Sequence, residues 1–149
     1  MDNNKKIKIL IVDDDPISGL LSEATIHIYS RDFEILRFEL PQEALDYLGQ
    51  LSSDDWPKLI FLDVEMPLLS GWQILDQLGS KISSQGQNTM INMLTSSISQ
   101  ENRVQFDARG EVSLYLNKPL NTRVLDTVIE NYNLSFHPEI MIESSNAQV

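Results

Sequence analysis

The chain has 149 residues, a formal net charge of −11 at pH 7 and no cysteine, and this length suits one domain with one cooperative core. The acidic balance argues against direct binding to nucleic acid, and the lack of cysteine excludes disulfides, thiolate catalysis and cysteine-ligated zinc. No apolar run in the sequence reaches the length of a bilayer span, so we expect a cytoplasmic protein without membrane contact.

Two β-α units are predicted at the start of the chain. Residues 7–12 form an apolar strand, and Pro16 opens a helix after it with Asp15 as the N-cap. The inner face of this helix is predicted from helical spacing to consist of Ile17, Leu20, Leu21, Ala24 and Ile28. Residues 33–40 form a second strand, and a second helix begins at Pro41. Its predicted inner face is Ala44, Leu45, Leu48 and Leu51.

A third unit follows a linker over residues 52–57. Its strand is the apolar run that ends at Asp63, and every position of that run is apolar, as expected for a buried strand in the middle of a parallel sheet. A short helix is predicted around residues 72–78, with an inner face of Trp72, Leu75 and Leu78. Residues 79–87 are predicted to be a loop, because they are rich in glycine, serine and glutamine.

The last two units complete the alternation. A strand over residues 89–94 precedes a weakly amphipathic helix over residues 100–108, and a fifth strand covers residues 112–116. The last helix is predicted to bury Val124, Leu125, Val128, Ile129 and Tyr132. Five strands that alternate with five helices predict an α/β fold: one doubly wound, five-stranded parallel sheet with helices on both faces. We expect this domain over residues 1–133, with residues 134–149 as a C-terminal extension and no output domain.

Polar side chains end four of the predicted strands. Asp13 and Asp14 follow the first, Asp63 ends the third, Thr95 follows the fourth and Lys118 follows the fifth. In an open parallel sheet such residues converge on one edge, where two close carboxylates repel each other by about 4 kcal/mol at an effective dielectric near 20. A set of oxygen ligands without histidine or cysteine favours Mg²⁺. A carboxylate beside that ion can attack phosphorus, with a hydroxyl and an ammonium group ready to bind the phosphoryl oxygens.

Four short strings carry a family resemblance. They are Ile-Val-Asp-Asp-Asp-Pro at 11–16, Leu-Asp-Val-Glu-Met-Pro at 62–67, Leu-Thr-Ser at 94–96 and Tyr-Leu-Asn-Lys-Pro at 115–119. In this order, each at the end of its own strand, they closely resemble the receiver domain of two-component response regulators, of the stand-alone, chemotaxis-regulator-like kind. The resemblance covers about residues 5–133 and implies the flavodoxin-like strand order 2-1-3-4-5.

The resemblance also implies a role for each matching residue. Asp63 is the expected phosphoacceptor, and the expected Mg²⁺ ligands are Asp14 directly, Asp13 through water, Asp63 and the backbone carbonyl of Glu65. Lys118, which precedes an expected cis proline, supplies the catalytic cation.

Two further residues are expected to form the switch. Thr95 supplies a hydroxyl that moves inward to meet the phosphoryl group, and the rotamer of Tyr115 follows Thr95. The spacing from Gly110 to Tyr115 is one residue longer than the common pattern, which either displaces Tyr115 or lengthens a turn.

The function implied is that of a response regulator receiver. It takes a phosphoryl group from the phosphohistidine of a histidine kinase or histidine phosphotransfer protein, with at most weak autophosphorylation and autodephosphorylation, and is not a metabolic enzyme. The signal is expected to leave through contact with an unknown downstream protein at the face made by the fourth helix, fifth strand and fifth helix, where analogy alone also allows a homodimer. The negative charge of Glu65 leaves the lifetime of the phosphoryl state open.

Two alternatives remain at this point. One is a pseudo-receiver that binds partners without phosphorylation, against which the acidic pair and Lys118 argue. The other is a phosphatase of the haloacid dehalogenase type, which needs a second aspartate two residues after the nucleophile. Glu65 is an imperfect substitute for that aspartate, and the sequence has no cap insertion.

Overall fold

A parallel five-stranded sheet forms the centre of the protein. The computed structural model describes residues 6–85 and 88–136. The sheet order is β2-β1-β3-β4-β5, and all neighbouring strands are parallel. The strands are β1 (Ile7–Val12), β2 (Phe33–Phe38), β3 (Leu59–Asp63), β4 (Met90–Thr95) and β5 (Val112–Asn117). The predicted fold class and strand order are therefore confirmed.

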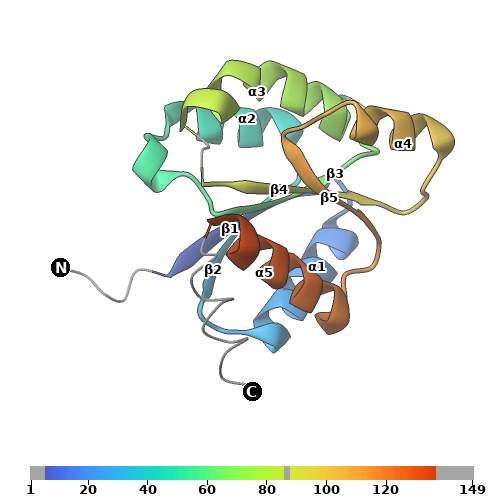
Figure 1. Ribbon diagram of the computed structural model, residues 1–149. Coiled ribbons are helices and arrows are strands. Elements are labelled where there is room, and N and C mark those ends of the chain that lie inside the picture. Colours follow the sequence, from blue (N-terminus) through green and yellow to red (C-terminus); the bar gives the residue numbers. More distant parts are fainter. Residues whose placement is uncertain (1–5, 86–87, 137–149) are drawn as a thin grey trace.

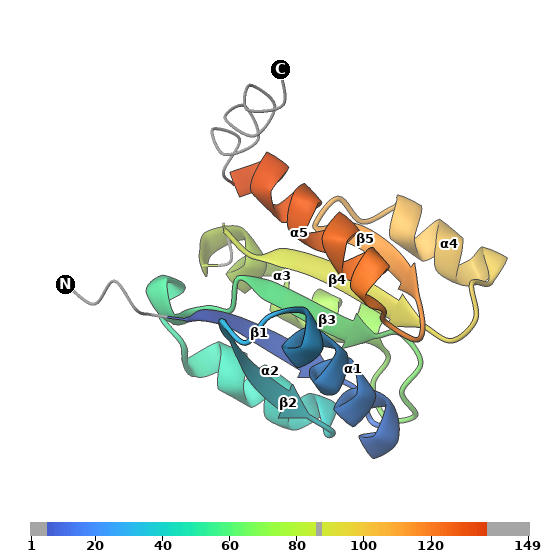
Figure 2. The same cartoon turned by 90° about the horizontal axis from the view of Figure 1, so that it is seen from below.

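Helices cover both faces of this sheet, as Figures 1 and 2 show. In chain order they are α1 (Pro16–Tyr29), α2 (Pro41–Gln50), the short 3₁₀ helix η1 (Ser53–Asp55), α3 (Gly71–Gln85), α4 (Gln100–Asp107) and α5 (Thr122–Phe136). Helices α1 and α5 lie on one face, and α2, α3 and α4 lie on the other. None of these helices, within the described ranges, combines the length and apolarity needed to cross a bilayer.

The sheet separates two apolar clusters. Every residue of β3 and of β4 is buried, since these strands have a neighbour on each side and helices above and below. Alternate residues point to opposite faces: Ile60 and Leu62 join the cluster under α2 and α3, whereas Leu59 and Phe61 join the cluster under α1 and α5. This arrangement fixes the carboxyl end of β3, and hence Asp63, in a rigid frame.

The predicted inner face of α1 is wrong. The residues assigned to it are exposed to solvent, namely Ile17, Leu20, Leu21, Ala24 and Ile28. The buried residues of the helix are instead Gly19, Ser22 and Ile26. Small residues let the helix approach the sheet closely; a Cβ atom on Gly19 would come within 3.1 Å of a side chain of β2. Helical spacing identified an apolar stripe on α1, but because the helix packs on the sheet through its small residues, that stripe faces solvent.

The predicted loop over residues 79–87 is also wrong, because α3 continues to Gln85. Ile82 packs on the core cluster under α2 and α3, and Lys81 Nζ donates to the backbone carbonyl of Gly49 in α2. These tertiary contacts hold the last turns in helical form despite Gly79, where an added Cβ would meet no atom within 4 Å. Residues 86–87 lie outside the described residues.

A shift of register in β5 accommodates the long spacing before Tyr115. Ile91 pairs with Val112 and Asn92 with Leu114, so Ser113 is the extra residue of a bulge. At the other end of the chain α5 runs to Phe136. The division into a domain over residues 1–133 and an extension over 134–149 stays a prediction, and residues 137–149 lie outside the described residues.

Candidate functional site

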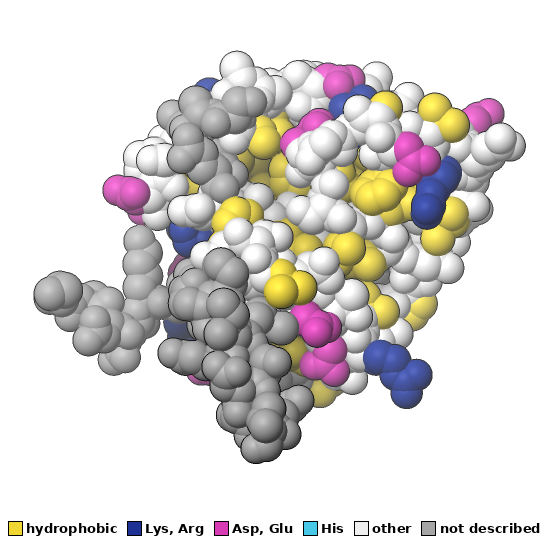
Figure 3. Space-filling model, in the orientation of Figure 1, with side chains coloured by type: hydrophobic (Ala, Val, Ile, Leu, Met, Phe, Trp, Pro, Cys, Tyr) yellow, Lys and Arg dark blue, Asp and Glu magenta, His cyan; other side chains and the backbone are white. Residues whose placement is uncertain are grey.

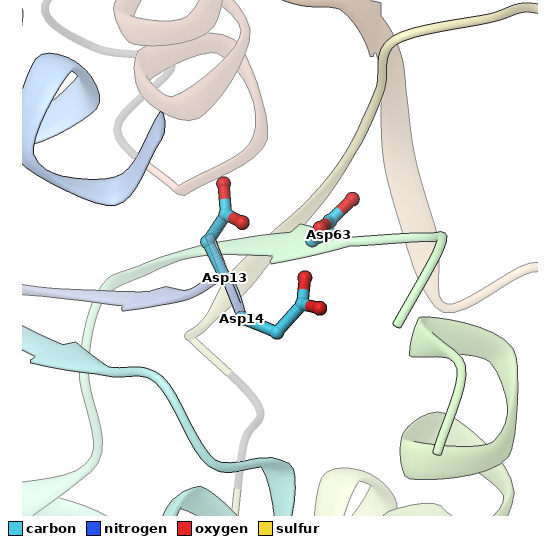
Figure 4. A group of neighbouring side chains, drawn as sticks. All are labelled: Asp13, Asp14 and Asp63. Atoms are coloured by element: carbon cyan, nitrogen blue, oxygen red, sulfur yellow. The ribbon is translucent and has the colours of Figure 1, made fainter. Parts of the chain in front are cut away.

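Three carboxylates meet at the carboxyl edge of the sheet. Asp13 and Asp14 follow β1 and Asp63 ends β3, and these two strands are neighbours (Figure 4). One carboxylate oxygen from each of the three lies within 4.8 Å of the others. Asp13 is fully buried, Asp63 is 3% exposed and Asp14 is half-buried. The sequence prediction that these carboxylates converge is therefore confirmed.

Lys118 reaches this cluster from the far side of β4. Its Nζ lies 2.8 Å from Asp13 Oδ2 and 3.3 Å from Asp63 Oδ2. The backbone N–H of Lys118 donates to the carbonyl of Thr95 at 2.7 Å, and the following peptide bond to Pro119 is cis, as expected. Contact with the two carboxylates outweighs burial and raises the pKa of Lys118, so the side chain stays a cation.

Asp13 is held by donors on three sides. Besides Lys118, the Ser18 hydroxyl donates to Oδ2 at 2.6 Å and the backbone N–H of Asp15 donates to Oδ1 at 3.0 Å. Burial alone would raise the pKa of Asp13, but these hydrogen bonds outweigh it and hold the pKa below its usual range. Sequence reasoning did not find Ser18, since only the position of α1 brings a residue five positions further along the chain to this carboxylate.

Asp63 has the opposite electrostatic environment. Burial, followed by the negative charge of Asp13, raises the pKa of Asp63 to about 7, and these effects outweigh Lys118 and the hydrogen bond from the N–H of Glu65. That hydrogen bond reaches Asp63 Oδ1 at 3.3 Å. Two neighbouring acids thus have pKa values displaced in opposite directions, an arrangement common at reactive sites.

The donor set fits a hard divalent cation. Oxygen atoms of three carboxylates lie close together and Lys118 contacts two of these carboxylates, so one lysine does not neutralise the cluster when all three are ionised. Their repulsion falls when a cation enters, and oxygen-only coordination by one or two carboxylates with water is the pattern that Mg²⁺ prefers. The direct role of Asp14, the water-mediated role of Asp13 and the Glu65 carbonyl as a ligand stay predictions.

Thr95 ends β4 beside this cluster and is fully buried. Its Oγ1 lies 2.7 Å from Glu65 Oε1 and 2.7 Å from the carbonyl of Ser97, and it accepts a hydrogen bond from the Ser97 N–H at 3.1 Å. The sequence predicted a metal ligand from the Glu65 backbone and an influence of its negative charge on the phosphoryl state, but no contact between its side chain and Thr95. The side-chain contact with Thr95 depends on how the two loops pack, which no sequence pattern shows.

Tyr115 lies in β5 and packs between two aromatic rings. Its ring stacks on Phe106 of α4 with centroids 5.6 Å apart, and the centroid of Trp72 in α3 is 6.3 Å away. Burial raises the pKa of the Tyr115 phenol. The bulge in β5 therefore leaves Tyr115 under α4 rather than displacing it. Its role as a switch stays a prediction.

Comparison with known proteins agrees with this geometry. The family model described as response regulator receiver domain matches residues 9–130. The chain is 30% identical over 131 residues to hybrid signal transduction histidine kinase C of Dictyostelium discoideum, an alignment that covers 84% of this chain and 10% of that protein. Hybrid histidine kinase D of the same organism is 29% identical, with 92% of this chain and 9% of that protein covered. The chain thus spans about a tenth of these relatives.

Solved structures show the same fold. A two-component response regulator from Cytophaga hutchinsonii superposes with a TM-score of 0.77 at 25% identity, covering 86% of this chain and 98% of that one. Chemotaxis protein CheY4 of Vibrio cholerae gives a TM-score of 0.69 at 25% identity, covering 86% and 99% of the two chains. Neither the phosphatase nor the pseudo-receiver alternative is favoured by these matches. The strand order, the acidic cluster with its lysine and the family match over 9–130 agree, and the chain belongs to the response regulator receiver domain family.

Proposed function

We propose that this receiver domain accepts a phosphoryl group on Asp63 from the phosphohistidine of a kinase or phosphotransfer protein, and that the transfer depends on Mg²⁺. The observation that carries the proposal is the pairing of one nearly buried carboxylate, Asp63, with Lys118 at 3.3 Å inside a group of acids that can hold a cation. A buried nucleophile of this kind needs a counter-charge at the moment of transfer, and both a lysine and a cation site are at hand.

The transfer balances without another reactant. An oxygen of the Asp63 carboxylate forms the new bond to phosphorus as the phosphorus–nitrogen bond of the donor breaks, and the nitrogen keeps the electron pair and takes a proton. Lys118, whose Nζ lies 3.3 Å from Asp63 Oδ2, and the Thr95 hydroxyl would bind the phosphoryl oxygens. Asp13, Asp14 and Asp63 would hold Mg²⁺, which when bound neutralises charge on those oxygens.

Weak autophosphorylation by small donors and slow autodephosphorylation belong to the same proposal. Lys118 and the acidic cluster belong to this chain, so the reaction with a small phosphoryl donor needs no residue from a partner. The partner's contribution is then to deliver and orient the phosphohistidine rather than to complete the site.

The exposed apolar face of α1 supports a docking place for that donor. Ile17 is 71% exposed and Leu21 is 56% exposed, and both lie in the part of α1 that begins at the acidic cluster, where Ser18 contacts Asp13. A partner that brings its histidine to Asp63 must cover this end of α1. Burial of such side chains contributes about 25 cal/mol per Å² of apolar area removed from water.

A second face supports the contact with a downstream protein. Hydrophobic side chains reach the surface over α4 and α5 in the view of Figure 3. Val104 of α4 is 61% exposed and Leu134 of α5 is 53% exposed. Helix α4 itself has no buried residue and is held through the partly buried Phe106 and the hydrogen bonds of Asn102, so it can shift at small energetic cost. We propose that the output partner, or a second copy of the receiver, binds this face.

The central test is intact-mass spectrometry after incubation with Mg²⁺ and phosphoramidate. We expect one phosphoryl adduct that requires Mg²⁺, is lost with chelator and is absent from Asp63→Asn. An adduct that persists in Asp63→Asn would refute the assignment of the acceptor. No adduct from phosphoramidate or from any phosphorylated histidine phosphotransfer protein would support the pseudo-receiver alternative.

The docking proposal has its own test with matched surfaces. Leu21→Asp should lower the rate of transfer from a phosphorylated histidine phosphotransfer protein at least tenfold and leave the rate with phosphoramidate unchanged. The matched control, Val104→Asp, introduces the same charge at an exposed apolar position of α4 and should change neither rate. Equal losses in both variants with the protein donor would reject α1 as the docking face.

A further inference from the structure

The Glu65 side chain gathers three donors from the opposite loop. It lies two residues after Asp63, and its carboxylate accepts hydrogen bonds from Thr95 Oγ1 at 2.7 Å, Ser96 Oγ at 3.1 Å and Asn102 Nδ2 at 3.3 Å. These donors come from the end of β4, the following loop and the first turn of α4. One side chain therefore ties the segment that carries the phosphoacceptor to the segment that carries the switch threonine.

Thr95 has one hydroxyl proton and cannot serve every acceptor around it. Glu65 Oε1 and the carbonyl of Ser97 are both 2.7 Å from Thr95 Oγ1. A phosphoryl group on Asp63 would add about −1.5 to −2 charges and three strong acceptor oxygens close by. Those oxygens compete for the same proton, and their charge also repels the Glu65 carboxylate.

Asn102 extends this connection to a tryptophan. While its Nδ2 donates to Glu65, its Oδ1 accepts a hydrogen bond from Trp72 Nε1 at 3.0 Å. The two bonds fix the orientation of the amide, because each uses a different end of it. Trp72 is only 7% exposed, and Arg109 lies over its ring at 5.4 Å from the centroid. The series of hydrogen bonds from Thr95 through Glu65 and Asn102 therefore ends at the indole N–H of Trp72, which can be observed by NMR spectroscopy.

We propose that Glu65 is a positioning residue that holds the Thr95 hydroxyl in the unphosphorylated receiver, in competition with the phosphoryl group on Asp63. Phosphorylation moves the hydrogen bond of Thr95 from Glu65 to the phosphoryl group, which frees Asn102 and changes the hydrogen bond of Trp72. The inference rests on the proposed function of Asp63. It identifies the contact between the acidic site and α4 that phosphorylation breaks.

The indole N–H resonances in a ¹H–¹⁵N spectrum test this proposal directly. In the wild-type protein we expect the Trp72 resonance to move on phosphorylation. In unphosphorylated Glu65→Ala the Trp72 resonance should already lie near the phosphorylated position, and phosphorylation should then move it little. Glu101→Ala, which removes an exposed carboxylate from the same turn of α4, is the matched control and should behave as wild type. The variant Trp56→Phe shows which of the two indole resonances belongs to each tryptophan. If Trp56→Phe does not fold, Trp72→Phe gives the same assignment.

A rate measurement separates positioning from a purely structural role. If a hydrogen bond to Glu65 must break before Thr95 binds the phosphoryl group, Glu65→Ala should accelerate adduct formation with phosphoramidate about fivefold. The rate for Glu65→Asp, which has a shorter side chain, should lie between those of the wild type and Glu65→Ala. Glu101→Ala should keep the wild-type rate. Damage to the fold alone would slow the reaction.

The outcomes are distinguishable from failure of the proposed function. An adduct in the wild type with an unmoved Trp72 resonance, or a Glu65→Ala spectrum that matches the unphosphorylated wild type, would overturn the role of Glu65 and leave the phosphoacceptor intact. No adduct on wild-type Asp63 would instead reject the proposed function and this inference with it.

Discussion

Removal of the Asp63 charge should stabilise the metal-free protein. Asp63 is 3% exposed and lies beside Asp13, and burial together with that neighbouring charge raises its pKa to about 7. Asparagine has nearly the same shape, and its carbonyl can still accept from Lys118. Asp63→Asn therefore removes the unfavourable ionisation and keeps the packing. We expect a higher free energy of unfolding for the variant at pH 8 in the presence of chelator.

The size and the pH dependence follow from linkage. In the unfolded chain Asp63 ionises near the ordinary value of 3.8, so its folded pKa is raised. The folded wild type binds this proton more tightly, so the contribution of Asp63 to stability falls as the pH rises from 3.8 to about 7 and is level above that. A shift of this size corresponds to about 4 kcal/mol as an upper value. Because Asp13 shares the titration, we expect a gain of about 2 to 4 kcal/mol in Asp63→Asn at pH 8.

Urea denaturation followed by circular dichroism, at pH 4 and at pH 8, measures this difference. The gain should be near zero at pH 4 and largest at pH 8, and saturating Mg²⁺ should narrow it by stabilising the wild type. The control is Asp54→Asn at an exposed position in η1, which should leave the free energy of unfolding unchanged at both pH values. Equal stability of Asp63→Asn and wild type at pH 8, or a gain of equal size at pH 4, would refute the reasoning.

Three further predictions concern the same edge of the sheet. Asp14→Asn should weaken Mg²⁺ binding about tenfold or more by isothermal titration calorimetry, since the proposed ligand loses its charge while the fold keeps its shape. Lys118→Met should destabilise the metal-free protein by about 3 kcal/mol at pH 8 in urea, because two buried carboxylates lose their cation, and by less at pH 5, where Asp63 takes up a proton. Gly71→Ala should lower the melting temperature, because the new Cβ would lie 2.5 Å from the carbonyl of Asp63, whereas Gly79→Ala should raise the free energy of unfolding by about 0.5 to 1 kcal/mol.

Each of these has an outcome that would contradict it. Unchanged Mg²⁺ affinity in Asp14→Asn would place the cation elsewhere in the cluster. If the loss of unfolding free energy in Lys118→Met does not depend on pH, packing and not the carboxylates explains that loss. Equal effects of alanine at Gly71 and Gly79 would show that the close approach of α3 to the end of β3 is unimportant.

The fold and much of the site could be predicted from the sequence because both depend on local sequence patterns. Apolar runs without interruption, such as the strand before Asp63, can be buried only between two helical layers, and strict alternation with helices permits few topologies. Strand order came from the resemblance and not from periodicity. Polar residues that follow directly on strands, such as Asp13 and Lys118, meet once the strands are parallel, because their place on the edge is fixed by the strand ends.

What the sequence by itself determined was therefore the set of elements, the parallel sheet and the residues brought to its carboxyl edge. Tertiary structure alone decided which side of α1 faces solvent, since Gly19 and Ser22 pack more closely than the apolar stripe could. It also decided how far α3 runs and where the side chain of Glu65 lies. Each of these depends on contacts between segments distant in the chain, and the spacing of residues along one segment holds no information about its neighbour's shape.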